Sequence, residues 1–204
     1  MKYTALASLL LCLSTPVSAN LITNGGFENP GFSTPPFFRY LANGDSTTIA
    51  NWTVMDDGIG EQPYLMNIAG YPTSIHEGSY ALSLNQGSGI VTDFSVIAGL
   101  DYKLSFFAKT TSGIVPDPLD VSIAGFASTF TPEAAFTEYN FMFTASSSDS
   151  AAILQFMNTS PVGDFRIWTL DNIQVNQVNS VPAPAAVWLL GSGLIGLIRV
   201  RKIS

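Results

Sequence analysis

The central part of the chain alternates apolar and polar residues with a period of two, and this pattern limits the fold more than any other feature. Clear examples run over 80–84, 102–106 and 139–143. This period places every second side chain on one face of a β-strand, so each segment predicts a strand with one face in a core. Helical spacing is not convincing anywhere in this region, although 132–136 is compatible with one short turn.

Further strands are predicted in six segments that are rich in apolar and β-branched residues, namely 47–54, 62–68, 89–96, 119–124, 151–157 and 166–175. Turn-forming clusters of Asn, Asp, Gly and Ser separate the segments, as at 43–45 and 146–149. Eight to ten short strands in about 160 residues predict an all-β fold. The most economical arrangement is an antiparallel two-sheet jelly-roll sandwich.

The charge balance excludes several classes of protein. Charged residues make up 11% of the 204 residues, and hydrophobic ones 47%. Chains that bind nucleic acid through a basic surface carry an excess of Lys and Arg, and disordered acidic tails combine high charge with few hydrophobic residues. This composition therefore excludes both classes. All fifteen acidic residues but only four of the eight basic ones lie between Glu28 and Asp171.

Residues 1–19 have the pattern of a secretory signal peptide. Lys2 precedes an apolar run over 5–13, and the small residues Val17 and Ala19 fit the positions before a signal-peptidase cut. We expect export through the inner membrane and a mature chain that begins at Asn20. A lipoprotein is the alternative, but Leu11 stands where a small residue is needed before Cys12.

Cleavage of this peptide would remove the only cysteine of the chain. The mature protein would then have no disulfide, no thiolate nucleophile and no cysteine ligand for a metal. Its stability would depend on the core of the domain over 20–179.

The C-terminal segment, 180–204, contains an uncharged apolar stretch over 184–198, which is followed by Arg199, Arg201 and Lys202. As a helix the stretch would be about 22 Å long, and the arginine side chains could extend its reach toward the roughly 30 Å of a membrane core. The basic cluster predicts a single transmembrane helix with its C-terminus in the cytoplasm until processing. The domain would then be periplasmic or extracellular. A buried core helix is the alternative.

The same segment resembles a known sorting signal. Val181-Pro182-Ala183-Pro184, a short apolar helix and a terminal basic cluster occur in the order found in PEP-CTERM tails of the VPLPA-like type. The resemblance implies a Gram-negative bacterium and processing by an exosortase near the Pro-x-Pro motif, often in organisms that make exopolysaccharide. Ala183 replaces the Glu of the commonest form, which leaves the subtype open.

The domain itself resembles the galactose-binding-like sandwiches, which include carbohydrate-binding modules and the DUF642 family. Four segments match in order: 20–28 as an opening strand, 50–52, 77–84, and 170–175 as the closing strand. Two departures are the missing Gly before Trp52 and the absence of the paired Cys of plant relatives.

If the first and last strands are neighbours, Glu28 and Asp171 approach one another and repel unless a cation lies between them. Calcium accepts an all-oxygen site, which the Gly26 carbonyl, Glu28, Asp171 and an oxygen near 77–79 could supply. The resemblance implies that such a calcium site is structural. The alternative is that Glu28 caps a turn while Asp171 accepts backbone hydrogen bonds at a strand end.

Sugar binding needs aromatic faces for stacking and planar polar groups for hydroxyls. The candidate ligand-binding residues are Trp52, Tyr64 and Tyr71. Tyr40 and Trp168 are further aromatic candidates, with Asn67, Asn85 and Gln86 as polar partners. The alternative is that the tryptophans belong to the core.

Catalysis has weak support in the sequence. His76 has no nucleophile arranged with it and is expected on a surface loop, and no nucleophile elbow is present. The carboxyls at 56–57 and 117–120 lie in loop-like sequence. We therefore expect a non-catalytic envelope protein that binds or organises extracellular polysaccharide. The alternatives are a structural matrix protein without a sugar ligand and a weak glycoside hydrolase with two carboxyls in a cleft.

Overall fold

The computed structural model describes residues 19–32, 37–58, 60–110, 118–131, 133–161 and 166–178. All of them belong to one compact unit, Ala19–Val178. The predicted signal peptide up to Ser18, the Pro-x-Pro motif, the apolar helix and the basic cluster lie outside the described residues. Within the described ranges, no helix is long and apolar enough to cross a membrane.

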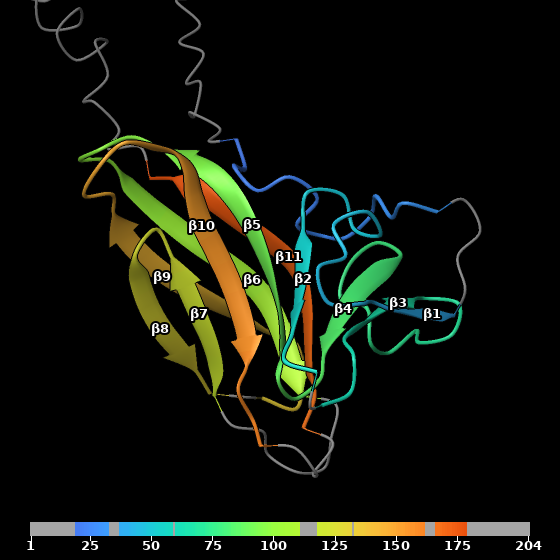
Figure 1. Cartoon of the computed structure of the whole chain (residues 1–204). Helices are drawn as coiled ribbons and strands as arrows, with labels where there is room; N and C mark the ends of the chain where they lie inside the picture. The colour runs from blue at the N-terminus through green and yellow to red at the C-terminus, as the bar shows by residue number, and fades with distance from the viewer. Residues whose placement is uncertain are drawn as a thin grey trace, which may run out of the picture. The chain divides into compact units, whose positions relative to one another are not determined.

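Within the described ranges, eleven strands form two antiparallel sheets, which lie face to face in Figure 1. The six-stranded sheet has the order β1 (Phe38–Tyr40), β3 (Tyr64–Asn67), β4 (Tyr80–Leu84), β11 (Trp168–Gln177), β6 (Asp101–Thr110) and β9 (Thr137–Thr144). The five-stranded sheet has the order β2 (Thr53–Asp56), β5 (Ser88–Val96), β10 (Asp149–Asn158), β7 (Leu119–Ile123) and β8 (Phe126–Phe130). From β4 to β7 the chain alternates between the sheets, and it does so again from β8 to β11.

The hydrophobic core fills the space between the sheets. In β6, buried residues alternate with half-buried ones along the strand, as the period of two predicts. The core contains large aromatic side chains that are fully buried, among them Trp52, Trp168, Tyr102, Phe106 and Phe156. A cysteine-free core therefore rests on aromatic and aliphatic packing.

The all-β two-sheet prediction is confirmed, and all nine predicted strands occur, eight of them with shifts at their ends. The largest shift concerns 47–54, where the strand begins only at Thr53. Asn51 has a φ of 68°, and Ile49 makes only an isolated bridge with Pro30. A residue with a left-handed φ does not continue a strand, so Asn51 belongs to a turn and the strand begins only after Trp52.

Two strands were not predicted, β1 and β8. β1 has three exposed residues, so it lacks the alternation that marks a half-buried strand. β8 follows β7 after a two-residue turn at Ala124 and Gly125, whose φ values are 49° and 86°. Two successive positive φ values are typical of a tight hairpin turn, which Ala at the first position conceals in the sequence.

The opening segment, 20–28, is not the strand that the resemblance implies. It consists of bends and turns, with positive φ values of 58° at Asn24 and 61° at Phe27. It nevertheless runs beside β11, because the Leu21 amide donates to the Val175 carbonyl and the Ile173 amide donates to the Gly25 carbonyl. The expected neighbourhood of the first and last segments is therefore present without a regular ladder.

Candidate functional site: an aromatic cluster beside an acidic clamp

Glu28 and Asp171 hold the same short stretch of chain, 76–80. Glu28 Oε1 accepts hydrogen bonds from the amides of Ser79 (2.8 Å) and Tyr80 (2.9 Å). Asp171 Oδ2 accepts from the amides of His76 (2.9 Å) and Glu77 (3.1 Å). We call these two carboxylates the acidic clamp. These hydrogen bonds are the ones expected from the metal-free alternative, in which Glu28 caps a turn and Asp171 accepts backbone hydrogen bonds at a strand end.

The two carboxylates also interact electrostatically. Asp171 is fully buried, whereas Glu28 is exposed. Burial raises the pKa of Asp171 to about 6, its three backbone hydrogen bonds oppose the rise, and the negative charge of Glu28 adds to it. No basic side chain forms an ion pair with either residue in the described part of the chain. A buried acid of this kind gains from a proton or a cation beside it.

A calcium ion fits the oxygen chemistry of the clamp. Glu28 Oε2 accepts no hydrogen bond from the described residues, and Asp171 Oδ1 accepts only the adjacent Asn172 amide at 2.7 Å. Gly26 faces both acids, since a Cβ on it would lie 3.7 Å from Glu28 Cγ and 4.0 Å from Asp171 Oδ1. No group of three or more His, Cys, Asp or Glu is placed to hold a metal within the described ranges, so carbonyl oxygens would have to complete the site.

Four aromatic rings gather at the β1 edge of the six-stranded sheet. Phe38 lies 5.3 Å from Tyr40, 5.9 Å from Tyr64 and 6.2 Å from Tyr71 between ring centroids, all edge to face. Tyr40 and Tyr64 are 5.7 Å apart. We call these four residues the aromatic cluster. Two of the three candidate ligand-binding residues, Tyr64 and Tyr71, are brought together here.

The cluster lies on the outer face of its sheet. Tyr40 pairs with Tyr64, and Tyr64 pairs with Ser83, so their side chains share one face of the sheet. The next residue, Leu65, points to the opposite face and belongs to the core, so the face with Tyr64 is the outer one. Tyr40 is 53% exposed and Phe38 is 40% exposed. Burial of the phenol is the largest cause that raises the pKa of Tyr64. The rings therefore combine accessible faces with phenol groups.

The third ligand-binding candidate, Trp52, is not available to a ligand. Its side chain is 1% exposed, its ring packs 5.9 Å from that of Phe27, and its indole N–H donates to the Asn24 carbonyl at 3.1 Å. Trp168 is likewise buried. Both are core residues, because the large apolar rings fall on the inward side of the sandwich.

The expected polar partners are also inaccessible. Asn67, Asn85 and Gln86 are all buried. Asn67 Oδ1 accepts from the Ala69 amide, and the Asn85 side-chain amide donates to the Gln62 carbonyl. These amides stabilise loops rather than face a ligand.

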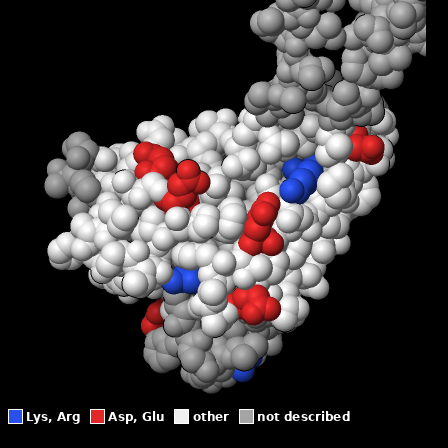
Figure 2. Space-filling view, turned by 180° about the vertical axis from the view of Figure 1, so that it is seen from behind, with Lys and Arg blue, Asp and Glu red and all other residues white. Residues whose placement is uncertain are grey.

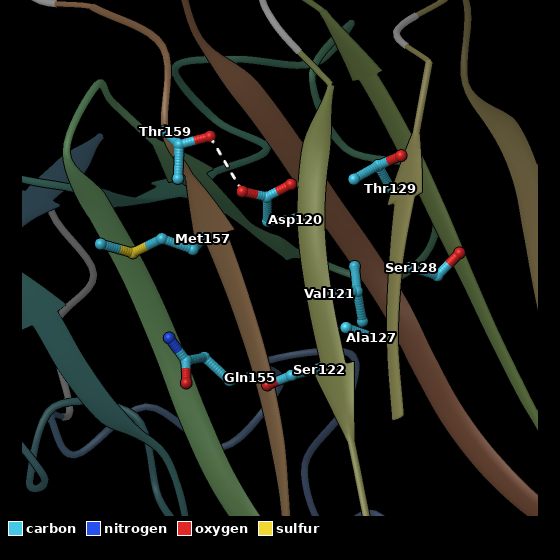
Figure 3. Close-up of a pocket in the computed structure, with 9 residues that line it drawn as sticks. All are labelled: Asp120, Val121, Ser122, Ala127, Ser128, Thr129, Gln155, Met157 and Thr159. Carbon is cyan, nitrogen blue, oxygen red and sulfur yellow. Dashed lines mark hydrogen bonds between the residues drawn. The ribbon is translucent and has the colours of Figure 1, made fainter. Parts of the chain in front are cut away.

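A shallow groove lies on the opposite side of the sandwich, on the outer face of the five-stranded sheet. It has a volume of about 750 Å³. Figure 3 shows its polar side chains, with Asp120 accepting a hydrogen bond of 3.0 Å from Thr159. Gln155, Met157 and Ser122 lie beside them on β10 and β7. Among the described residues, its lining has one carboxyl and no aromatic ring, so this part of the groove offers no stacking surface.

The other carboxyl candidates do not form a cleft pair in the described residues. Asp56 Oδ1 accepts from the Gly58 amide and caps a turn. Asp117, the expected partner of Asp120, lies outside the described residues. His76 is exposed, as expected for a surface loop, but its ring stacks on Phe107 at 3.7 Å.

Sequence reasoning missed Phe38 and Lys109. Phe38 lies in the run Phe37-Phe38-Arg39-Tyr40, whose aromatic content without a strand pattern was the available signal for an exposed edge. Lys109 donates to the Thr73 carbonyl and lies over the Phe136 ring at 4.9 Å. Nothing in the local sequence of β6 marks that contact, because Thr73 is in a distant loop.

No family model matches this sequence, and no curated protein matches it. Solved structures do. A CBM61 module in complex with β-1,4-galactotriose matches with 15% identity and a TM-score of 0.50, over 79% of this chain and 100% of its own. A structure titled "CBM4 structure and function" matches with 18% identity and a TM-score of 0.48, over 77% and 99%.

An arabinose-bound GH51 α-L-arabinofuranosidase also matches, with 13% identity and a TM-score of 0.50, over 78% of this chain but only 26% of the enzyme. At such identities the likeness shows the fold alone. This chain is a two-sheet sandwich similar to that of carbohydrate-binding modules.

Proposed function

We propose that the protein is an exported, non-catalytic polysaccharide-binding protein, and that the aromatic cluster is its sugar-contacting surface. The observation that carries the proposal is the gathering of Phe38, Tyr40, Tyr64 and Tyr71 on one exposed sheet edge. Exposed aromatic rings in contact with one another form an apolar patch that a ligand can cover. Their faces suit the C–H side of a pyranose ring, and their hydroxyls suit its oxygens.

The fold supports the proposal. The similar CBM61 module was solved with β-1,4-galactotriose, which makes a neutral galactan a reasonable first probe. Among the described residues, the lining of the opposite groove has a single carboxyl, which does not provide both the acid and the base or nucleophile of a glycosidase. A matrix protein without a sugar ligand is the second candidate, favoured by the absence of aromatic rings from the described lining of that groove.

Charge favours a neutral glycan, or an acidic one bridged by calcium. Acidic residues outnumber basic ones in the domain, and Figure 2 shows acidic side chains spread over the visible face with few basic ones among them. Such a surface repels polyanions at low ionic strength.

The test is retardation of the full chain in native gels that contain β-1,4-galactan or xylan. We expect Tyr64→Ala and Tyr40→Ala to abolish the retardation, whereas Met142→Ala, which removes another exposed apolar side chain, leaves it unchanged. If Gln155→Ala abolishes binding instead, the groove is the ligand surface and the aromatic proposal is wrong. If no polysaccharide retards the wild type, the matrix-protein alternative is favoured.

We further propose that calcium binds the acidic clamp through Glu28, Asp171 and the carbonyl of Gly26, and stabilises the junction of the first and last segments. Its chemistry there would be charge neutralisation. Thermal unfolding with millimolar calcium or with chelator tests this. At about a hundred times the dissociation constant, calcium would add roughly 2.7 kcal/mol to the free energy of unfolding. A rise that persists in Glu28→Gln would place the ion elsewhere.

Export and sorting are also proposed, on sequence grounds alone. The signal peptide would export the domain, and an exosortase would recognise 180–204 in the membrane. Fractionation of cells that carry Pro182→Ala with Pro184→Ala tests this proposal. Normal processing and release of that variant would contradict the role of the Pro-x-Pro motif.

A further inference from the structure

The loop that connects β3 to β4, residues 68–79, spans two regions of the outer face of the six-stranded sheet. Its ends are closed by a hydrogen bond of 2.9 Å from the Ile68 amide to the Ser79 carbonyl. Between them the chain leaves the aromatic cluster, reaches β11 and β6, and returns. The loop therefore contacts both the proposed sugar surface and a distant part of the same sheet.

The near part of the loop carries Tyr71 into the aromatic cluster. The amides of Gly70 and Tyr71 both donate to the Asn67 carbonyl, at 3.0 and 2.9 Å. Gly70 lies so close to the Phe37 side chain that a Cβ on Gly70 would overlap the Phe37 Cβ. These contacts fix the start of the loop. They do not hold the residues that follow Tyr71.

The far part of the loop is held by side chains of β6 and β11. The Lys109 ammonium donates to the Thr73 carbonyl at 2.5 Å, and the His76 ring stacks on Phe107. Asp171 accepts from the amides of His76 and Glu77. Burial lowers the pKa of Lys109, so its charge is only partly screened by water at this contact.

Lys109 itself lies far from the aromatic cluster. Strand register gives the row Tyr40, Tyr64, Ser83, Thr169 and Lys109 across five neighbouring strands. At a strand spacing of about 4.8 Å, Lys109 is roughly 14 Å from Tyr64. Lys109 would therefore affect a sugar stacked on Tyr64 through the loop and not by direct contact.

We propose that Lys109 is a positioning residue for the sugar-contacting surface, because it fixes the 68–79 loop and thereby keeps Tyr71 packed on Phe38. This inference rests on the proposed function. Without the Lys109 contact, the middle of the loop between Tyr71 and His76 would sample more conformations, and ordering it at the moment of binding would cost affinity. A loop held in place beforehand avoids that cost.

The chain offers a matched control. Lys103 lies on β6, half-buried like Lys109, on the same outer face, and its contact is an ion pair with Glu138 at 3.8 Å rather than a bond to the loop. Lys109→Met and Lys103→Met therefore remove the same charge from the same strand. Lys109→Arg keeps a donor for the Thr73 carbonyl.

Two readouts on the full chain separate the possibilities. The first is hydrogen exchange of the amides over 69–76, and the second is affinity for soluble β-1,4-galactan and xylan. We expect Lys109→Met to speed exchange in this loop and to weaken binding about three- to tenfold, with Lys109→Arg near wild type and Lys103→Met unchanged in both. Thermal unfolding of each variant corrects for global destabilisation.

The outcomes are distinguishable. Faster loop exchange with unchanged affinity overturns the positioning role and leaves the proposed function standing. Unchanged exchange overturns the anchoring itself. Absence of polysaccharide binding in the wild type overturns both the proposed function and this inference.

Discussion

Glu28 and Asp171 lie 143 positions apart in the sequence, yet each accepts two backbone amides from the single stretch 76–80. Gly78 allows this arrangement, because its φ of 71° turns the chain between the two carboxylates and a Cβ there would overlap Glu28. Three segments that are remote in sequence are thus joined by two acids and one glycine. This junction also ends the loop that carries Tyr71.

The raised pKa of Asp171 predicts that stability falls as pH rises. The pKa is about 6 in the folded protein against an ordinary value of 3.8, so the folded state binds more protons between these values. In chelator, the free energy of unfolding should decrease by about 2 kcal/mol from pH 4 to pH 6 and level off above pH 6.

Urea unfolding at several pH values measures this dependence. Asp171→Asn should lack this component while retaining the pH dependence of other groups. An identical pH profile in that variant would show that Asp171 ionises normally.

The opposite sign is predicted for Asp45. Burial raises its pKa, but hydrogen bonds from Thr48 and Thr47 outweigh that effect and lower it to about 2. Its ionised form stabilises the fold above pH 4, and this contribution is lost as pH falls through 2. Because the carboxylate is partly exposed, Asp45→Ala should cost only about 1 kcal/mol at pH 7. The difference between the variant and the wild type should shrink in acid denaturation below pH 3.

Adjacent glycines should respond differently to the same substitution. A Cβ at Gly25 would overlap the Ile173 carbonyl oxygen on β11, whereas one at Gly26 meets only ordinary contacts. Gly25→Ala should therefore lower the melting temperature, on the scale of about 4 °C or more for a loss near 2 kcal/mol. Gly26→Ala should leave it nearly unchanged. Equal effects would mean that the opening segment does not lie against β11 in solution.

Trp52 and Tyr64 should separate stability from binding. Trp52→Phe leaves a gap in the core and removes the donor to the Asn24 carbonyl, which should cost about 2 kcal/mol without weakening polysaccharide binding. Tyr64→Ala should weaken binding with a smaller loss of stability. Loss of binding in a folded Trp52→Phe protein would contradict the assignment of Trp52 to the core.

The sequence predicted the strands whose two faces differ. β6 and β9 alternate because one face packs in the core, and that signal is local. β4 shows the same pattern in its sequence, although all five of its residues are buried. β1 carries no such signal because all three residues are exposed. The turn at Ala124 and Gly125 was hidden for a similar reason, since a non-glycine residue there adopts a positive φ.

The sequence predicted some residues of the candidate sites and missed others. Glu28 and Asp171 were expected to approach each other, and they do, through the backbone of 76–80. Tyr64 and Tyr71 were named without knowledge of Phe38 and Tyr40, which complete the cluster. Trp52 was named as a ligand candidate with the core as the alternative, and it is buried, because residue type alone does not show whether a ring packs in the core or faces solvent.

By itself, the sequence determined the fold class and the absence of cysteine from the domain, because periodicity and composition are properties of the chain. Only the tertiary structure decided which aromatic rings remain accessible and which are buried. It also decided that Lys109 reaches the Thr73 carbonyl. Both depend on the pairing of β1, β3, β4, β11 and β6 in one sheet, and strand pairing is set by contacts between residues far apart in the sequence.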